Sequence, residues 1–297
     1  MTKESGASGD QLFSFQTKEG EKAMEAFEQD PQHAVVVEDW DGNKAPTVKF
    51  PDMPFVDPRY RGLYEQLVEQ IGAAGLLTGR SVGQIRQFGQ EYGWENGLLV
   101  PGTHMIGQFG CEYWHHGRLT VPVARPSKFD MVVEELPGVL ADAGVTSPSI
   151  EKVKSHFVAG HYDAGTDEET VARVVSGCTA LAKRASTPES RLVCHAGNSV
   201  VEIGPAGVNK ENSLAWFVCS LPFLPSVVYF SGDGEQDERA FRALNWLRKQ
   251  GVPVIKGGTS GSNGVFANKN VERQADLHLR GPQGNLAFMQ WVCQLTA

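Results

Sequence analysis

Hydrophobic residues along the chain follow two patterns that alternate. Short apolar runs such as 35–37 and 226–230 are typical of strands buried on both faces of a parallel sheet. Segments such as 18–29 and 239–250 instead carry an apolar residue every three or four positions, which predicts amphipathic helices. Strands that alternate with helices in this way predict an α/β fold with a doubly wound, Rossmann-like parallel sheet.

Weaker signals suggest further elements. Residues 60–74 predict a helix, residues 75–78 and 98–100 predict short strands, and Ser81 is a typical N-cap for another helix. The Gly/Ser-rich stretch 257–264 predicts a mobile loop beside the functional site, with a phosphate-binding loop as the alternative. Two further segments are predicted to be irregular, the tail 1–11 and the proline-rich stretch 46–58.

The regular alternation is interrupted in the middle of the chain. Two helical segments (131–143 and 168–183) accompany a strand at 155–162 and a hairpin at 192–203, which together are typical of an α+β unit. We therefore predict a core domain made of residues 1–116 and 204–297, and an inserted α+β domain made of residues 117–203.

Composition restricts the possible partners. The 297 residues are 41% hydrophobic and 21% charged, as in ordinary globular proteins. A net charge of −8 argues against a nucleic-acid partner, and no apolar run is long enough to predict a membrane-spanning helix. The five cysteines are scattered without a CxxC pair, which favours reduced thiols. We expect a cytoplasmic protein, monomeric or a small homo-oligomer, that binds neither nucleic acid nor membrane.

Acidic residues follow the ends of two predicted strands. Asp39 and Asp41 come directly after the first buried strand, and Asp233 and Asp237 follow a later one. Ligands of open α/β sheets bind at the carboxyl ends of the strands. Carboxylates crowded at this edge repel one another, and a bound cation relieves the repulsion. The pattern predicts a metal site, whereas an isolated Asp-Gly turn at a strand end is the structural alternative.

A hydroxyl and a lysine complete a set suited to phosphoryl transfer. Thr78 ends a predicted strand, and Lys210 opens a helix just after the insertion. One carboxylate can attack phosphorus while a second carboxylic acid protonates the leaving oxygen. Mg²⁺ offsets the negative charge, and a lysine and a hydroxyl hold phosphate oxygens. Without its neighbours, however, Lys210 would be an ordinary surface lysine at the start of a helix.

Four motifs carry a family resemblance. They are Asp39-Trp-Asp-Gly-Asn-Lys-Ala-Pro, Thr78-Gly-Arg, Val201-Glu-Ile-Gly-Pro-Ala-Gly-Val-Asn-Lys-Glu and Gly232-Asp-Gly-Glu-Gln-Asp-Glu-Arg-Ala-Phe. They resemble, in order, the Asp-Tyr-Asp-Gly-Thr-Leu-Ala-Pro, Ser-Gly-Arg, Val-Glu-Ile-Arg-Pro-x-Gly-Val-Asn-Lys-Gly and Gly-Asp-Asp-x-Thr-Asp-Glu-x-Ala-Phe motifs of one group of proteins. That group is the trehalose-6-phosphate phosphatases of the haloacid-dehalogenase superfamily. The resemblance covers about residues 34 to 295.

The resemblance implies a role for each matching residue. It implies that Asp39 is the nucleophile and Asp41 the general acid and base, with phosphate held by Thr78, Gly79 and Lys210. The implied Mg²⁺ ligands are Asp39, Asp41 through its backbone carbonyl, Asp233 and, in support, Asp237. The insertion would be a cap over the sugar, contacted by Glu151, Lys154, His161 and Glu202. For Glu202, a solvent-facing position on a hairpin is the alternative.

The chain also departs from the family pattern. The departures are Asn43 for threonine, Phe109 for histidine, Asp163 for arginine, Gly204 for arginine, Glu211 for glycine and Gly234 for aspartate. Three hypotheses follow. The first is a Mg²⁺-dependent phosphatase of trehalose 6-phosphate or a close analogue. The second is a phosphatase of a pseudo-disaccharide or aminocyclitol phosphate, whose amine Asp163 and Glu211 could contact. The third is a catalytically idle relative that binds a sugar phosphate or a partner protein.

Overall fold

The computed structural model describes residues 11–46, 55–152, 154–197 and 199–296. Most of the predicted tail (1–10) and of the predicted proline-rich loop (47–54) therefore lies outside the described residues. The same is true of Asn198 in the turn of the predicted hairpin. No helix in the part of the chain that the structure describes is long and apolar enough to cross a membrane.

The larger sheet has nine strands within the described residues. They are β1 (Phe13–Phe15), β2 (Ala34–Glu38), β3 (Ala73–Leu77), β4 (His104–Gly107), β5 (Glu112–His115), β6 (Arg118–Thr120), β11 (Val227–Gly232), β12 (Val254–Ser260) and β13 (Leu277–Arg280). Their order is β1-β13-β12-β11-β2-β3-β4-β5-β6. Neighbouring strands from β13 to β4 are parallel, whereas β1, β5 and β6 add antiparallel edges. The central strands β11, β2 and β3 are buried along their whole length, as their apolar runs predict.

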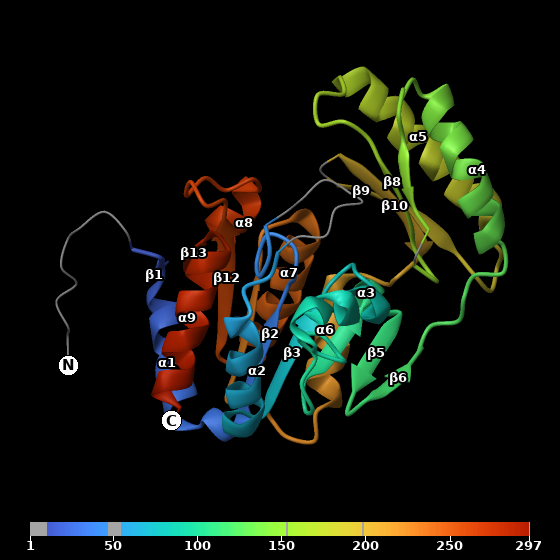
Figure 1. The fold of residues 1–297 in the computed structure, drawn as a ribbon. Helices are drawn as coiled ribbons and strands as arrows, with labels where there is room; N and C mark the ends of the chain where they lie inside the picture. The colour runs from blue at the N-terminus through green and yellow to red at the C-terminus, as the bar shows by residue number, and fades with distance from the viewer. Residues whose placement is uncertain (1–10, 47–54, 153, 198, 297) are drawn as a thin grey trace.

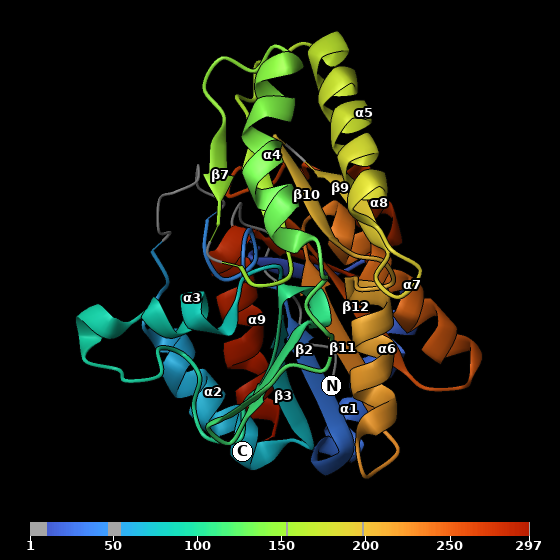
Figure 2. The same cartoon turned by 90° about the vertical axis from the view of Figure 1, so that its right-hand side faces the viewer.

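Helices cover both faces of this sheet. One face packs against α1 (Lys18–Gln29), α2 (Arg59–Gln70), α3 (Val82–Gln87) and α9 (Gly281–Leu295). The other face packs against α6 (Lys210–Ser220), α7 (Glu235–Lys249) and α8 (Lys269–Gln274). Figure 2 shows α2, α3 and α9 on one side of the strands and α6 and α7 on the other. The predicted doubly wound α/β fold is confirmed.

A second, smaller sheet has the order β7-β8-β10-β9 and is antiparallel throughout. Its strands are β7 (Ser149–Glu151), β8 (Val158–His161), β9 (Leu192–Gly197) and β10 (Val200–Pro205), and it carries α4 (Phe129–Asp142) and α5 (Glu168–Ala185). The two helices bury one face of the sheet through a core of its own, which includes Leu136 and Leu181. In Figure 1 this unit stands above the larger sheet, with α4 and α5 on its outer side. The helices and the hairpin predicted for the insertion are therefore present.

The predicted domain boundaries at residues 117 and 203 stay a prediction. Two observations bear on them. Strand β6, which follows residue 117, pairs with β5 in the larger sheet. Strand β10 continues past residue 203 to Pro205.

Three element predictions are wrong in position. The helix predicted for 60–74 ends at Gln70, because the helix-favouring Ala and Leu residues of 73–77 enter the parallel sheet instead. The run 98–100 is a buried turn, since a short apolar run alone does not define a strand. The predicted loop 257–264 begins as buried strand β12. Gly257 is required there by close packing, because a Cβ would lie 2.8 Å from the Cβ of Ser231.

A fully buried polar cluster lies behind the end of β2. Lys44 donates a short hydrogen bond to the carboxylate of Glu38. The same carboxylate accepts hydrogen bonds from the Tyr64 hydroxyl at 2.7 Å and from Asn285 Nδ2 at 2.7 Å. The Lys44 ammonium also lies 4.7 Å from the centre of the Tyr60 ring. This cluster joins β2 and the loop after it to α2 and α9.

We predict that Lys44→Met lowers the free energy of unfolding by about 3–5 kcal/mol, because it leaves the Glu38 carboxylate buried without its counter-charge. The double variant Glu38→Gln, Lys44→Met removes both charges and should recover much of the loss. Urea unfolding of both variants measures these changes in the free energy of unfolding. Lys22→Met, at an exposed position of α1, is the matched control and should change stability by less than about 0.5 kcal/mol. If Lys44→Met and the control had equal free energies of unfolding, Lys44 would not be the necessary counter-charge of the buried Glu38 carboxylate.

Candidate active site

One cavity of about 850 Å³ lies between the carboxyl ends of the parallel strands and the open face of the smaller sheet. Every site residue that the sequence predicted lines it. These are Asp39, Asp41, Thr78, Gly79, Glu151, Lys154, His161, Glu202, Lys210, Asp233 and Asp237. The structure thus brings the predicted residues of the core and of the insertion into a single site, while the individual roles stay predictions.

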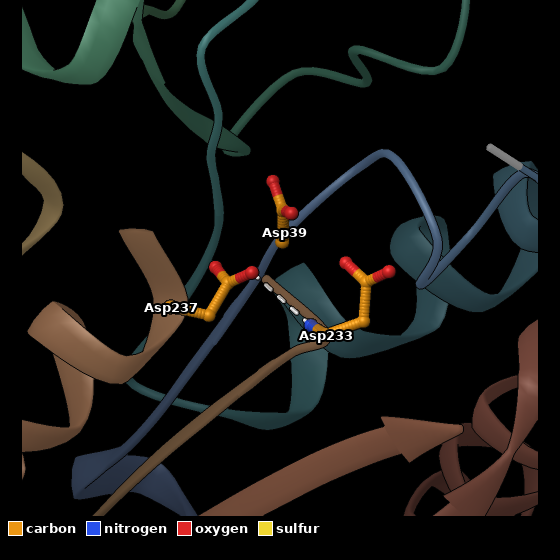
Figure 3. Close-up of side chains that lie close together, drawn as sticks. All are labelled: Asp39, Asp233 and Asp237. Carbon is orange, nitrogen blue, oxygen red and sulfur yellow. Dashed lines mark hydrogen bonds between the residues drawn. The ribbon is translucent and has the colours of Figure 1, made fainter. Parts of the chain in front are cut away.

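Three aspartates form the centre of this site (Figure 3). Asp39 follows β2, Asp233 follows β11 and Asp237 lies in the first turn of α7, and an oxygen of each lies within 4.8 Å of the other two. Asp237 Oδ2 accepts hydrogen bonds from the backbone N–H of Asp233 at 3.1 Å and of Gly234 at 2.8 Å. The cluster could hold a metal ion, because carboxylate oxygens are the preferred ligands of hard divalent cations.

Lys210 joins two of these acids. Its Nζ lies 2.7 Å from Asp39 Oδ1 and 2.6 Å from Asp237 Oδ1, and the side chain is almost fully buried. Burial alone would lower the pKa of Lys210, but the negative charges of Asp237 and Asp39 outweigh it and raise the pKa. Lys210 therefore stays charged and fixes one oxygen of Asp39, whose side chain also lines the cavity.

The acids remain short of positive charge despite Lys210. Burial, followed by repulsion from Asp237, raises the pKa of Asp39 well above its ordinary range. The same two causes raise the pKa of Asp233 to about 7. Raised carboxyl pKa values are expected where several acids share a site that is built to receive a cation.

The loop after β2 must be a tight turn to make room for Asp233. Gly42 has φ +71°, and a Cβ at this position would lie 2.1 Å from Asp233 Oδ2. A glycine is required both by the backbone angle and by the close approach of the carboxylate. The Asp-Gly turn that the sequence offered as an alternative is therefore present, and it forms part of the acidic site.

Asn43, which replaces the family threonine, ties this loop to two neighbouring strands. Its Nδ2 donates to the Asp39 carbonyl at 3.2 Å and to Ser231 Oγ at 2.9 Å, and its Oδ1 accepts from Thr259 Oγ1 at 2.6 Å. The side chain is fully buried. An amide can make all three bonds, so this departure adds support behind Asp39.

Asp41 is not part of the acidic cluster through its side chain. Both of its oxygens accept hydrogen bonds from Arg80, at 2.8 Å from Nε and 2.6 Å from Nη2. Arg80 belongs to the Thr78-Gly-Arg motif, and its backbone N–H also donates to Thr78 Oγ1 at 3.2 Å. Arg80 therefore links the predicted acid and base to the predicted phosphate-binding loop.

The smaller sheet contributes a buried charged row. Lys154 Nζ lies 3.3 Å from Glu151 Oε2 and 3.0 Å from Glu202 Oε1. Glu151 also accepts a 2.7 Å hydrogen bond from Gln84 of α3, which is a direct link between the two sheets' units. Burial would raise the pKa of Glu151, but bonds from His161, Lys154 and Gln84 lower the pKa to about 2. Glu202 faces the cavity, so its predicted alternative position in solvent is wrong.

Two other departures from the family, Phe109 and Gly204, both lie against the Phe157 ring. The Phe109 and Phe157 rings pack edge to face, with their centres 5.1 Å apart. A Cβ at Gly204, where the family has arginine, would lie 2.2 Å from the Phe157 ring. The Phe157 ring, which packs against Phe109, thus leaves no room for a side chain at position 204. Asp163 and Glu211 are absent from the described residues that line the cavity, so the predicted contact of these acids with an amine is not supported.

Several lining residues were missed by the sequence analysis. They are Gln84, His195, Glu235, Gln236 and residues 267–270. For His195 a signal existed, because it stands directly opposite Glu202 in the β9–β10 hairpin and so shares its face. Gln84 and residues 267–270 could not be found this way, since Gln84 lies in α3 and residues 267–270 form the loop end and first residues of α8, both of which follow other strands.

The fold and the acidic centre define a class of protein. A doubly wound core with a cap, and carboxylates at the ends of two adjacent strands, are the features of haloacid-dehalogenase phosphatases. A chain described as a trehalose-6-phosphate phosphatase-related protein has this fold, with a TM-score of 0.64 and 18% identity over 88% of this chain and 98% of its own. The C-terminal domain of the trehalose-6-phosphate phosphatase of C. albicans also has it, with a TM-score of 0.71 and 17% identity over 95% and 98%.

The sequence comparison identifies the family. The family model for trehalose-phosphatases matches residues 37–274. The trehalose-6-phosphate phosphatase of Escherichia coli K12 is 26% identical over 235 residues, which are 75% of this chain and 78% of that protein. The chain belongs to the trehalose-phosphatase family and is a phosphoric monoester hydrolase.

We predict that a divalent cation stabilises the protein more at high pH than at low pH. With a folded-state pKa of about 7, Asp233 contributes stability that is present at low pH and is lost as pH rises through about 7. A cation must displace that proton, so its affinity rises with pH. Thermal unfolding with MgCl₂ or EDTA, at about pH 6 and about pH 8, measures the effect. Asp233→Asn should reduce the pH difference, and the remainder comes from Asp39, whose pKa is also raised. An equal rise in Tm at both pH values in the wild type would contradict the prediction.

Proposed function

We propose that the protein is a Mg²⁺-dependent phosphatase that acts through an aspartyl phosphate on Asp39. Its substrate is a sugar phosphate of disaccharide size, with trehalose 6-phosphate as the leading candidate. The observation that carries the proposal is the ion pair between Lys210 Nζ and Asp39 Oδ1, which lie 2.7 Å apart. It leaves the second oxygen of this buried carboxylate free of Lys210, in a side chain that lines the cavity beside two further acids. A positioned carboxylate of this kind is what nucleophilic attack on phosphorus requires.

The first half of the reaction forms a covalent intermediate. The free oxygen of Asp39 attacks phosphorus while the bond from phosphorus to the sugar oxygen breaks. Asp41 gives its proton to that leaving oxygen. In the structure both oxygens of Asp41 are bound by Arg80, so Arg80 must release at least one of them before Asp41 can carry the proton.

The second half of the reaction restores the enzyme. Water attacks the phosphorus of the acyl phosphate, Asp41 takes a proton from the water, and Asp39 leaves as a carboxylate. Thr78, Gly79 and Lys210 line the cavity beside Asp39 and are suited to hold phosphate oxygens. The donor set of Asp39, Asp233 and Asp237 suits Mg²⁺, which when bound offsets negative charge on the phosphate and the acids. The Asp41 backbone carbonyl would complete the protein ligands.

The size and lining of the cavity support the substrate class. About 850 Å³ is ample for a disaccharide phosphate and lies within the range of small-molecule sites. Glu151, Lys154, His161 and Glu202 would contact sugar hydroxyls from the smaller sheet. The relatives' names give trehalose 6-phosphate as the leading candidate within this class. A pseudo-disaccharide or aminocyclitol phosphate is the second candidate, although the position of Asp163 and Glu211 removes its original support.

We predict that trehalose 6-phosphate is hydrolysed with Mg²⁺ and not with EDTA, and that Asp39→Asn reduces phosphate release by about 10³-fold or more, because no carboxylate remains to attack. A panel of trehalose 6-phosphate, hexose phosphates, an aminocyclitol phosphate and an aryl phosphate measures the rates and ranks the substrates. Asp142→Asn, on the outer helix α4, is the matched control and should keep full activity.

Two outcomes would overturn parts of the proposal. Hydrolysis that persists in Asp39→Asn would remove the covalent mechanism. Folded wild-type protein that releases no phosphate from any member of the panel would favour the idle, sugar-phosphate-binding relative.

A further inference from the structure

Two residues beside the Thr78-Gly-Arg motif have strained backbones. Gln108 and Phe109 follow β4 with φ of +47° and +57°, in the left-handed region that residues other than glycine rarely adopt. The N–H of Gln108 donates to the Arg80 carbonyl at 2.9 Å, and the N–H of Phe109 donates to the Thr78 carbonyl at 3.0 Å. Strained residues persist where the surrounding structure holds them, and they are common at functional sites. Here the strained turn is bonded to both ends of the motif.

The Gln108 side chain connects the core to the smaller sheet. It is fully buried. Its Nε2 donates to the Glu112 carboxylate of β5 and to Ser155 Oγ at 3.0 Å, and its Oε1 accepts from the backbone N–H of His156 at 3.0 Å. Ser155 and His156 belong to the connection between β7 and β8 of the smaller sheet. One amide therefore bonds to both parts of the molecule.

A second link holds the same connection at its other end. Glu112 Oε2 accepts a 2.7 Å hydrogen bond from the backbone N–H of Val82, the first residue of α3. Gln84 of the same helix donates to Glu151, the last residue of β7, at 2.7 Å. The core therefore holds the β7–β8 connection at both ends, and Glu112 joins the two links.

The connection held in this way carries part of the cavity wall. Glu151 and Lys154 both line the cavity, and Lys154 lies between the two links in sequence. Gln108 is absent from the described residues that line the cavity, so it can affect a substrate only through the residues that it holds. The Phe109–Phe157 contact packs the same junction, but apolar packing is non-directional. Three hydrogen bonds at one amide instead fix the direction and separation of the groups that they join.

We propose that Gln108 is a positioning residue, which holds Glu151 and Lys154 of the smaller sheet at a fixed distance from the phosphate-binding segment 78–80 of the core. This role rests on the proposed function, because it concerns how the same cavity selects its substrate. A sugar phosphate must contact both groups of residues at once, so their separation decides how well it binds. A substrate held by its phosphate alone is indifferent to that separation.

Gln108→Met keeps the length of the side chain and removes its three hydrogen bonds. It should raise KM for trehalose 6-phosphate about 10-fold, with kcat changed less, because Glu151 and Lys154 are no longer held in one position. Activity on an aryl phosphate, which has no sugar, should stay within about 2-fold. Gln66→Met, at an exposed position of α2, is the matched control and should match the wild type.

An exchange of the two buried groups provides a conservative rescue. Gln108→Glu alone places a second carboxylate against Glu112 and should raise KM at least as much as Gln108→Met. The double variant Gln108→Glu, Glu112→Gln restores one amide and one carboxylate. Its bonds can form again, because the Ser155 hydroxyl can donate as well as accept. Its KM should return to within about 3-fold of the wild type, and a KM no better than that of Gln108→Glu would contradict the proposal.

Hydrogen exchange and binding separate this role from the proposed reaction. Without substrate, Gln108→Met should raise the exchange rate of the peptide that contains Ser155 and His156 about 10-fold and leave α5 unchanged. Calorimetry in the Asp39→Asn background measures the affinity of trehalose 6-phosphate with and without Gln108→Met. If the wild type hydrolyses no phosphate ester, but exchange rises and binding weakens about 10-fold, the proposed reaction fails and the positioning role stands.

Three results would overturn the positioning role. The first is an unchanged KM and affinity in Gln108→Met, or no binding of trehalose 6-phosphate by either protein. The second is an equal loss of activity on the aryl phosphate, which would indicate a general disturbance of the site. The third is a raised KM without faster exchange, which would mean that Gln108 acts by another route.

Discussion

The repulsion among Asp39, Asp233 and Asp237 is the constraint on which the rest of the site depends. Three carboxylates within 4.8 Å of one another are compatible with a folded core only if positive charge is brought to them or some of them are protonated. The chain supplies part of this positive charge through the buried ammonium of Lys210, which contacts two of the acids. The raised pKa values of Asp39 and Asp233 show that this charge is not sufficient. The site is therefore arranged to receive more positive charge, and a metal ion supplies it in the proposed reaction.

The surroundings of the cluster are built to hold it rigid. Asn43 ties the Asp39 carbonyl to β11 and β12, and the Glu38–Lys44 pair anchors the same loop to the helices behind the sheet. Burial lowers the pKa of Lys44 despite the attraction of Glu38, so the pair costs desolvation free energy. We interpret it as a device for positioning the loop that carries Asp39. The departures from the family pattern are thus accommodated by new contacts, as the Phe109–Phe157 pair beside Gly204 also shows.

Much of the fold could be predicted because long apolar runs and long amphipathic segments are unambiguous. β2, β11, α1 and the β9–β10 hairpin follow directly from such patterns. The predicted boundaries at 60–74 and 257–264 are wrong because packing places helix-favouring residues in β3 and glycines in β12. The pattern of apolar residues in the sequence carries no information about this packing. The acids were found because they follow strand ends. Gln84 and Gln236 were not, since their place in the cavity depends on how the smaller sheet stands over the core.

The most direct test of the central claim is to stop the reaction with acid during turnover of trehalose 6-phosphate and Mg²⁺, and to map phosphorylation by mass spectrometry. The account predicts one phosphoryl group on the peptide that carries Asp39, which disappears when substrate is exhausted. Rapid phosphate release with no phosphoryl group on Asp39 at any time, or with one on another residue, would contradict it.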